Sequence, residues 1–310
     1  MGETVRAAGV RAARQQRASD WATVKAFLDE WSPEPFVAIV KPIQSAGSDD
    51  VFKCCSEEEV RVAFDRINGA INGLGVVNEG VLVQEFLDGP EFVVGSVSRD
   101  GVHKVVALWE YDKRAANGQF NVYFGTYFRR PTGPVPDALL AYARSVLDAL
   151  QIVNGPGHME VKMTSTGPCL VEVGSRCHGG EGTWQPVALE CVGYSQVGAT
   201  LDVYVNPSAF DALPLVPGGG TLRKFGAEID IVAYRDGVVT EIPGAVVVRT
   251  LPSFRKMELA VQPGTAIKKT VDCFTRPASV LLLHDDEATL LADVASIRGL
   301  ERDGMFTFRD

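Results

Sequence analysis

Hydrophobic residues along the chain follow a helical period in some segments and a strand period in others. Helical spacing appears in residues 20–31 and 137–150, where apolar side chains recur every three or four positions. Ser56 and Glu59 form the S-x-x-E pattern of a capping box, which predicts a third helix that reaches residue 68. Shorter helices are expected in the segments 1–9, 185–192, 195–205 and 287–297.

Strand patterns occupy much of the remaining chain. Alternating residues on both sides of turn signals predict two hairpins, in residues 91–111 and 157–176. Turn-rich segments are interpreted as connections, with a mobile loop at 115–119 and a linker at 214–220. Since strands and helices alternate without a βαβ period, the sequence predicts an α+β protein. Apolar runs predict three further strands, in the segments 35–42, 51–54 and 80–87.

Composition narrows the classes of function without naming one. The 310 residues are enough for two domains, each with its own core. A formal net charge of −9 and a pI near 5.1 argue against a broad basic face, so we expect no nucleic-acid partner. No apolar run approaches the roughly 20 residues of a membrane helix, so we expect no membrane partner. The six cysteines lack any paired spacing, which favours reduced thiols in a cytoplasmic protein.

The first segment with candidate chemistry is VKPIQSAGSDDV. Lys41 stands at the end of a predicted buried strand and precedes a loop of small residues. The lysine would supply a point charge, while Gly47 permits unusual backbone angles. A surface turn with a solvated lysine explains the same pattern and stays open as the alternative. Successive N–H groups of a curled loop can surround phosphate oxygens, here those of Ser45, Ala46, Gly47 and Ser48.

The second segment is VLVQEFLDGPEF, a strand followed by a tight turn. The end of this strand can present backbone groups and Glu85 to the edge of an adenine ring. Glu91, just after the turn, would then lie within reach of ribose hydroxyls. A hairpin with two solvated acids is the alternative interpretation.

The hairpin GHMEVKMTSTGPCLVEVGSR carries the sharpest signal. If its loop centres on Thr166, Glu160 lies directly opposite Glu172, with Cβ atoms about 4.5–5.5 Å apart. Like charges in these positions destabilise a hairpin, and a hard cation such as Mg²⁺ removes the repulsion. A shift of the turn by one residue would separate the two acids. His158 faces the same way as Glu160, Arg176 lies further along the second strand, and solvated residues on an outer face are the alternative.

These three segments, in this order and spacing, resemble the ATP-grasp superfamily and most closely its branch of carnosine synthases and bacterial L-amino acid ligases. The motifs are KPIQSAGSDDV, VQEFLDGPEF and HMEVKMTSTGPCLVEVGSRCHGG. The C-terminal segments GVVTEIPG, LPSF, VQPGTAIKKTVD and IRGLERDGMF are similar to the accessory region of that branch. The resemblance covers nearly the whole chain, and the ordered set is more specific than any single motif.

The resemblance implies a fold and a reaction. ATP would lie between a small lid lobe, residues 1–92, and a large lobe with the metal site, residues 93–205. Residues 206–310 would form an accessory α/β region that completes the large lobe. A small carboxylate, such as an amino acid, would attack the γ-phosphate, and an amine would then displace phosphate to form an amide or peptide bond. A homodimer is compatible with this arrangement.

The resemblance also assigns roles to single residues. Two ions of Mg²⁺ or Mn²⁺ would be held by Glu160 and Glu172. Arg176 would stabilise charge on the transferring phosphate or acyl-phosphate, and His158 would assist near the acyl group. ATP would be held at its phosphates by Lys41, Ser45, Ala46, Gly47 and Ser48, at its adenine by Gln84, Glu85 and Leu87, and at its ribose by Glu91.

Three features depart from the family pattern. Gly174 stands where the family usually has Asn, two residues after the second metal carboxylate. Asp50 stands where the phosphate loop usually has Gly, and a carboxylate beside phosphate is unfavourable unless it points away. The family's N-terminal domain is missing, because Met1 begins inside a helix that normally follows it, so we expect a truncated chain or an internal start. A nucleotide-binding or regulatory protein without turnover is the alternative function, and carboxylation or purine synthesis is a third.

Two weaker candidates complete the set. Trp109, Tyr111 and Lys113 alternate with acids, which indicates one shared face, and we favour packing over substrate contact for that face. Residues 177–180 read Cys-His-Gly-Gly and are interpreted as a glycine-rich substrate loop. A nucleophile and its base are not expected there, because adjacent side chains diverge.

Overall fold

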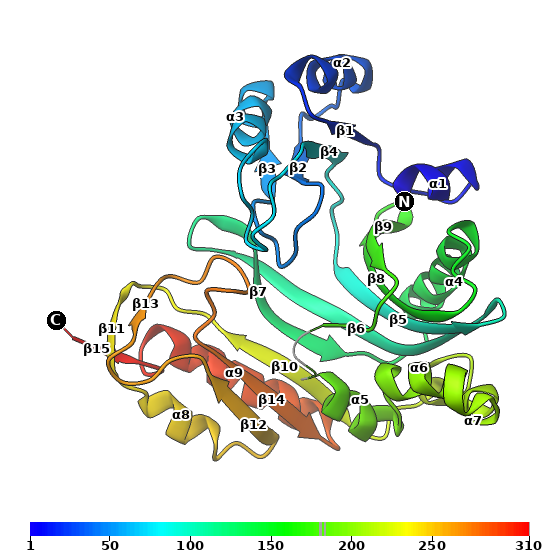
Figure 1. The fold of residues 1–310 in the computed structure, drawn as a ribbon. Coiled ribbons are helices and arrows are strands. Elements are labelled where there is room, and N and C mark those ends of the chain that lie inside the picture. Colours follow the sequence, from blue (N-terminus) through cyan, green and yellow to red (C-terminus); the bar gives the residue numbers. More distant parts are fainter. Residues whose placement is uncertain (180–181, 183, 310) are drawn as a thin grey trace.

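The structure is a computed structural model that describes residues 1–179, 182 and 184–309. Two antiparallel sheets of unequal size dominate it, the smaller standing above the larger in Figure 1. Helices α2 (Trp21–Trp31) and α3 (Glu57–Ile67) pack on the smaller sheet and enclose the core of this small lobe. That sheet has four strands in the order β1 (Gln15–Ala18), β4 (Val81–Glu85), β2 (Ala38–Pro42) and β3 (Phe52–Cys54).

The helix starts in the small lobe follow from capping residues in the sequence. The carboxylate of Asp20 accepts the N–H of Thr23 at 2.8 Å and begins α2. Ser56 Oγ accepts the N–H of Glu59 at 3.2 Å, which confirms the predicted capping box. The Glu59 carboxylate reaches back one residue further than expected, to the N–H of Cys55 at 2.6 Å.

The larger sheet has eight strands, and its C-terminal strands β10, β12 and β14 extend the part formed by residues 91–174. Every neighbouring pair is antiparallel, so sequence-adjacent hairpins build most of it. The strand order is β12 (Phe254–Leu259), β14 (Ala278–His284), β10 (Phe225–Ile231), β7 (Gln119–Phe128), β6 (Val102–Ala116), β5 (Glu91–Arg99), β8 (Gly155–Thr164) and β9 (Gly167–Gly174).

Helices cover both faces of the large sheet. One face packs against α4 (Pro134–Ala149) and α9 (Glu287–Arg302). The opposite face packs against α5 (Trp184–Val192) and α6 (Gln196–Val205). The N-terminal helix α1 (Gly2–Ala7) rests on α4, with Val5 fully buried, so it belongs to the core of the large lobe.

The remaining elements lie at the edges of the large lobe. Within the described ranges, no helix is both long and apolar enough to span a bilayer. The predicted linker at 214–220 contains one turn of 3-10 helix, η1. These elements are α7 (Pro207–Ala212), η1 (Pro217–Gly220), α8 (Pro243–Val248) and a small sheet of β13 (Ala266–Ile267), β11 (Gly237–Glu241) and β15 (Thr307–Phe308).

The segment 115–119 is a tight hairpin turn, so the prediction of a loop in this segment was wrong. Asn117 and Gly118 have φ of 52° and 84°, the left-handed pair that a two-residue turn requires. The Asn117 side chain donates to the carbonyls of Ala233 and Thr270, at 2.9 and 2.7 Å. The Asn-Gly pair was itself a hairpin signal in the sequence, and these distant carbonyls fix the turn in place.

Candidate functional site

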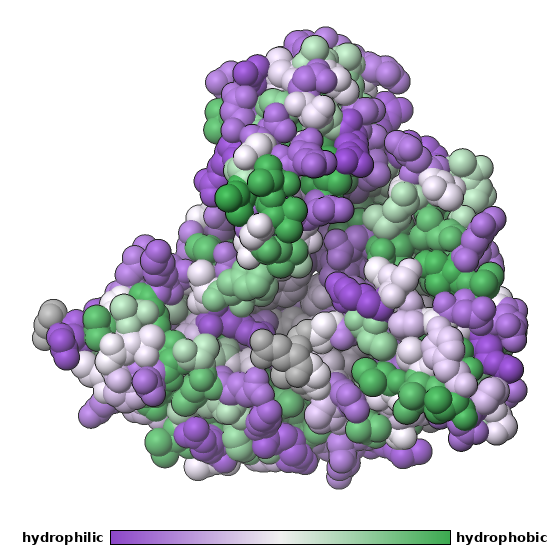
Figure 2. Space-filling view, in the orientation of Figure 1, coloured by the Kyte–Doolittle hydropathy of each residue, from purple (hydrophilic) through white to green (hydrophobic). Residues whose placement is uncertain are grey.

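A hollow separates the small lobe from the large sheet (Figure 2). Lys41 belongs to β2 of the small lobe and is half-buried. Burial lowers the pKa of this lysine, while the charges of Glu172 and Glu160 act in the opposite direction. A small-lobe ammonium group therefore faces carboxylates of the large sheet, although the two are far apart in sequence.

The β8–β9 hairpin places those carboxylates opposite each other. Its turn is Ser165-Thr166, with Thr164 paired to Gly167, so a regular ladder would set Glu160 against Val171. A β-bulge between Glu160 and Val161 shifts the register by one residue and pairs Glu160 with Glu172. The predicted pairing of Glu160 with Glu172 is therefore confirmed. The predicted turn centre was wrong by half a residue, and the extra residue in β9 offsets that shift in register.

His158 joins the two glutamates in one cluster. One potential ligand atom from each of the three residues lies within 4.8 Å of the other two. His158 Nε2 is 3.4 Å from Glu160 Oε1, and both side chains are almost entirely buried. The hydroxyl of Tyr111 donates to the same Glu160 oxygen at 3.0 Å.

The two carboxyl groups have different pKa values because their surroundings differ. Burial would raise the pKa of Glu160, but the neighbouring His158 side chain and the charge of Lys113 lower it below the usual value. Burial raises the pKa of Glu172, and the charge of Glu160 raises it further. Two close carboxylates of this kind, with an imidazole beside them, are a donor set that suits a divalent cation.

Glu91 is held in a buried ion pair. Its carboxylate lies 2.6 Å from the ammonium group of Lys113 and 3.4 Å from that of Lys162. Burial alone would lower the pKa of Lys113, but the charge of Glu91 raises it well above the usual value. Each oxygen of Glu91 can still accept a second hydrogen bond.

The face formed by Trp109, Tyr111 and Lys113 is only partly explained by packing. Trp109 packs against Trp184 and Phe128, with ring centroids 4.9 and 4.6 Å away. Tyr111 and Lys113 instead contact the carboxylates of Glu160 and Glu91. The alternation along β6 indicated this shared face, but only the neighbouring strands decide which of its residues reach the site.

His178 also lies at the cluster, which the sequence did not predict. Its ring meets that of His158 edge-on at 4.4 Å and lies against Trp184. Its Nε2 is 3.4 Å from the Tyr111 hydroxyl. Burial, together with the charge of His158, lowers the pKa of His178 well below the usual value. Gly180, the last residue of the predicted substrate loop, lies outside the described residues.

The loop after Lys41 has the backbone of a tightly curled segment. Gly47, Ser48 and Asp50 have φ of 68°, 66° and 48°. The Asp49 carboxylate accepts hydrogen bonds from the Ser45 hydroxyl at 2.8 Å and from the N–H of Gly73 at 2.7 Å. Ala46, which follows Ser45 in this loop, is exposed.

Asp50 does not face the loop interior. Its carboxylate pairs with Arg66 of α3 at 3.0 Å. This pairing places a positive charge of α3 against the carboxylate, which makes an acid at this position compatible with a loop that binds phosphate.

The predicted adenine-framing residues lie at the end of β4. Gln84 is buried within the sheet, and Leu87 packs in a small cluster with Ala13 and Cys169. Glu85 is held by the segment before β1: its carboxylate accepts the N–H of Arg14 at 3.0 Å and pairs with Arg11 at 3.3 Å. The Glu85 side chain is thus engaged by the protein, and its N–H also donates to the carbonyl of Arg14 at 2.8 Å.

Arg176 is exposed just beyond β9. Its guanidinium donates to the carbonyl of Cys177 at 3.1 Å, and its charge lowers the pKa of Glu172 slightly against the effect of burial. A Cβ atom at Gly174 would lie 3.4 Å from Arg176 Cγ, so the arginine stem rests on this glycine.

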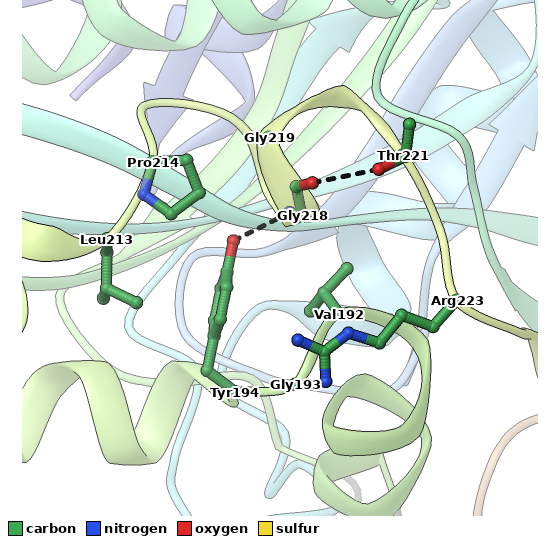
Figure 3. Close-up of a pocket in the computed structure, with 9 residues that line it drawn as sticks. All are labelled: Val192, Gly193, Tyr194, Leu213, Pro214, Gly218, Gly219, Thr221 and Arg223. Carbon is green, nitrogen blue, oxygen red and sulfur yellow. Dashed lines mark hydrogen bonds between the residues drawn. The ribbon is translucent and has the colours of Figure 1, made fainter.

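A separate cavity lies elsewhere in the large lobe. It has a volume of about 310 Å³ and sits between the end of α5 and η1 (Figure 3). The hydroxyl of Tyr194 accepts the N–H of Gly218 there at 2.9 Å, and Arg223 extends along the same wall. None of the residues that line it belongs to the His158, Glu160 and Glu172 cluster.

Similarity to known proteins agrees with this geometry. The family described as ATP-grasp domain matches residues 33–185. Dapdiamide A synthase from Enterobacter agglomerans is 32% identical over 313 residues, which cover 98% of this chain and 70% of that protein. The chain therefore belongs to the ATP-grasp family, and its relatives within the family include L-amino acid ligases.

Solved structures share the fold at low sequence identity. The crystal structure of L-amino acid ligase from Bacillus licheniformis matches with a TM-score of 0.77 at 17% identity, over 100% of this chain and 71% of that one. The biotin carboxylase domain of the Hydrogenobacter thermophilus 2-oxoglutarate carboxylase, crystallised with MgADP, matches with a TM-score of 0.64 at 14% identity, over 98% and 68%. The α+β class and the ATP-grasp fold expected from the sequence are confirmed.

Proposed function

We propose that this chain is an ATP-dependent carboxylate–amine ligase that forms an amide bond between an amino acid, or a similar small carboxylate, and an amine. The observation that carries the proposal is the cluster of Glu160, Glu172 and His158, whose potential ligand atoms lie within 4.8 Å of one another. The charges of Glu160 and Glu172 also act on Lys41 of the small lobe. The relatives named as dapdiamide A synthase and L-amino acid ligase support the same reaction class.

The proposed reaction has two steps. A carboxylate oxygen attacks the γ-phosphorus of ATP, the bond to the ADP oxygen breaks, and an acyl-phosphate forms. The amine nitrogen then attacks the carbonyl carbon, phosphate leaves with that carboxylate oxygen, and the nitrogen loses its proton. A divalent cation held by Glu160 and Glu172 would supply charge neutralisation at the phosphates.

The other residues take roles that fit their positions. Lys41 and the N–H groups of residues 45–48 would bind phosphates. Glu91 would accept a hydrogen bond from a ribose hydroxyl, because Lys113 and Lys162 leave some lone pairs of its carboxylate unused. Arg176 would stabilise the charge of the transferring phosphate. Adenine would lie against the chain at Gln84, Glu85 and Leu87.

Oxygen transfer tests this reaction directly. The protein is incubated with Mg-ATP, a panel of amines and carboxylates labelled with ¹⁸O, and the products are analysed by mass spectrometry. We expect an amide product and one ¹⁸O atom in each phosphate released. Phosphate without label, or ATP binding without any release, would contradict the ligase and favour a nucleotide-binding protein without turnover.

Glu172→Ala tests the site itself. The variant should lose the thermal stabilisation that Mg-ATP gives the wild type, while its far-ultraviolet circular dichroism stays unchanged. Glu190→Ala is the matched control, because Glu190 is an exposed acid of α5 paired only with Lys224 among the described residues. Retained stabilisation in the Glu172 variant would remove this residue from the metal site.

A further inference from the structure

We propose that His158 is a direct metal ligand, so that the cation site has two carboxylates and one imidazole and favours Mn²⁺ over Mg²⁺. This inference rests on the proposed function, because it concerns the cation that accompanies ATP. It reassigns His158, which the sequence placed near the acyl group. The inference is supported by the position of His158 on β8, beside Glu160 and opposite β9.

His158 is positioned as the glutamates are. It precedes Glu160 by two residues on β8, so both side chains point to the same face of the sheet. Its direct partner on β9 is Gly174, which carries no side chain of its own. Its side chain is 4% exposed, and its Nε2 lies 3.4 Å from Glu160 Oε1.

The ring is not held as a structural histidine would be. Its contact with Glu160 is 3.4 Å, longer than the usual 2.7–3.2 Å of an N–H···O hydrogen bond. Nδ1 is buried and has no hydrogen-bond partner among the described residues. Buried polar atoms normally have a hydrogen-bond partner. Since this ring lacks one at Nδ1, packing against His178 positions it, and its Nε2 is available to bind a cation.

Chemistry then favours particular ions. Mg²⁺ takes oxygen ligands in strict octahedral geometry, whereas imidazole suits later divalent metals and Mn²⁺ accepts mixed oxygen and nitrogen sets. A third protein ligand also adds to the affinity that two carboxylates provide. His178 supplies an internal comparison, since it is a second, half-buried imidazole that lies next to His158 but is not one of the three clustered ligand residues.

Pulsed electron paramagnetic resonance of bound Mn²⁺ reports a coordinated nitrogen directly. We expect ¹⁴N modulation in the protein loaded with Mn²⁺ and ATP, lost in His158→Gln and kept in His178→Gln. Adenine also carries nitrogen, so protein labelled with ¹⁵N-histidine is measured with unlabelled ATP. The modulation should then change to the ¹⁵N pattern, which requires no variant and does not depend on how well one folds.

Affinity gives a second, independent readout. Calorimetric titration with ATP present should show that His158→Gln weakens Mn²⁺ binding by roughly tenfold or more and Mg²⁺ binding much less, since even outer-shell partners of metal ligands contribute roughly 10–100-fold. Nucleotide-dependent Mn²⁺ binding without histidine modulation would overturn the role of His158 and leave the proposed function intact. Absence of any Mn²⁺ or Mg²⁺ binding with ATP would overturn both.

Discussion

Glu160 and Glu172 are direct cross-strand partners because β9 carries one residue more than β8 between them and the hairpin turn. The β-bulge that absorbs this residue keeps both carboxylates on the face that looks toward Lys41. A regular ladder from the same turn would send Glu172 to the opposite face, since a shift of one residue reverses every side chain. The bulge is therefore what assembles the acidic pair.

Protonation of Glu172 should compete with the cation. Burial and the charge of Glu160 raise the pKa of Glu172, so its proton persists to higher pH than in an ordinary glutamate. Metal affinity should fall as the pH decreases through this pKa. The sign for stability is opposite: without metal, a carboxyl whose folded pKa is raised contributes stability below its unfolded pKa and loses it as the pH rises.

Chemical denaturation in EDTA checks the second part. The free energy of unfolding of Glu172→Gln, relative to that of the wild type, should increase as the pH rises from about 4 to about 8. Adding Mn²⁺ and ATP should reverse the order at the upper end. A difference that does not change with pH would contradict the raised pKa.

Gly47 should be sensitive to any side chain. Its φ is 68°, and a Cβ atom would meet Cys273 Sγ at 2.2 Å. We expect Gly47→Ala to weaken ATP binding by roughly tenfold, because left-handed strain of about 1–3 kcal/mol and a displaced thiol both distort the loop. Isothermal titration calorimetry measures the affinity.

Two variants separate strain from contact. Gly9 has a similar φ of 76°, and a Cβ atom there would meet no described atom of a non-adjacent residue within 4 Å, so Gly9→Ala should leave ATP binding unchanged. Adding Cys273→Ala to Gly47→Ala should recover part of the lost affinity. If the double variant binds no better than Gly47→Ala, contact with Cys273 is not part of the defect.

Arg66 should protect the phosphate loop from Asp50. Removing the guanidinium in Arg66→Ala frees a negative charge beside the phosphates, which at a few ångströms in water costs about 1 kcal/mol, or roughly fivefold in ATP affinity. Arg66→Ala combined with Asp50→Asn should restore binding. Arg61→Ala, which breaks the Arg61–Asp65 pair on the same helix, should have no effect. Equal losses in Arg61→Ala and Arg66→Ala would point to a general effect on α3.

Lys113 should matter for stability as well as for binding. Lys113→Met leaves the buried Glu91 carboxylate with only the longer contact to Lys162, and breaking a buried pair in this way costs about 3 kcal/mol. Urea denaturation measures the loss. The double variant Lys113→Met with Glu91→Gln should recover most of it, because no uncompensated charge remains. If the double variant is the less stable of the two, the pair is not the source.

Local signals in the sequence predicted the small lobe and the hairpins well. Asp20 and Ser56 mark helix starts because their side chains cap the N–H groups three residues later. The hairpin around Asp100 and Gly101 was predicted for a similar reason, since both residues have the positive φ that its turn requires. The Asn117-Gly118 turn carried the same signal, although a loop was predicted there.

The candidate site likewise combines features that local sequence determines with features that only tertiary contacts determine. The sequence by itself determined which strand ends carry lysine and glutamate, and the alternation that sets Glu160, His158 and Tyr111 on chosen faces, because a period of two is a local property of a strand. Only the tertiary structure decided the bulge that brings in Glu172, the approach of Lys41, the turning of Asp50 toward Arg66 and the position of His178. These depend on contacts between segments distant in sequence, which no local pattern encodes.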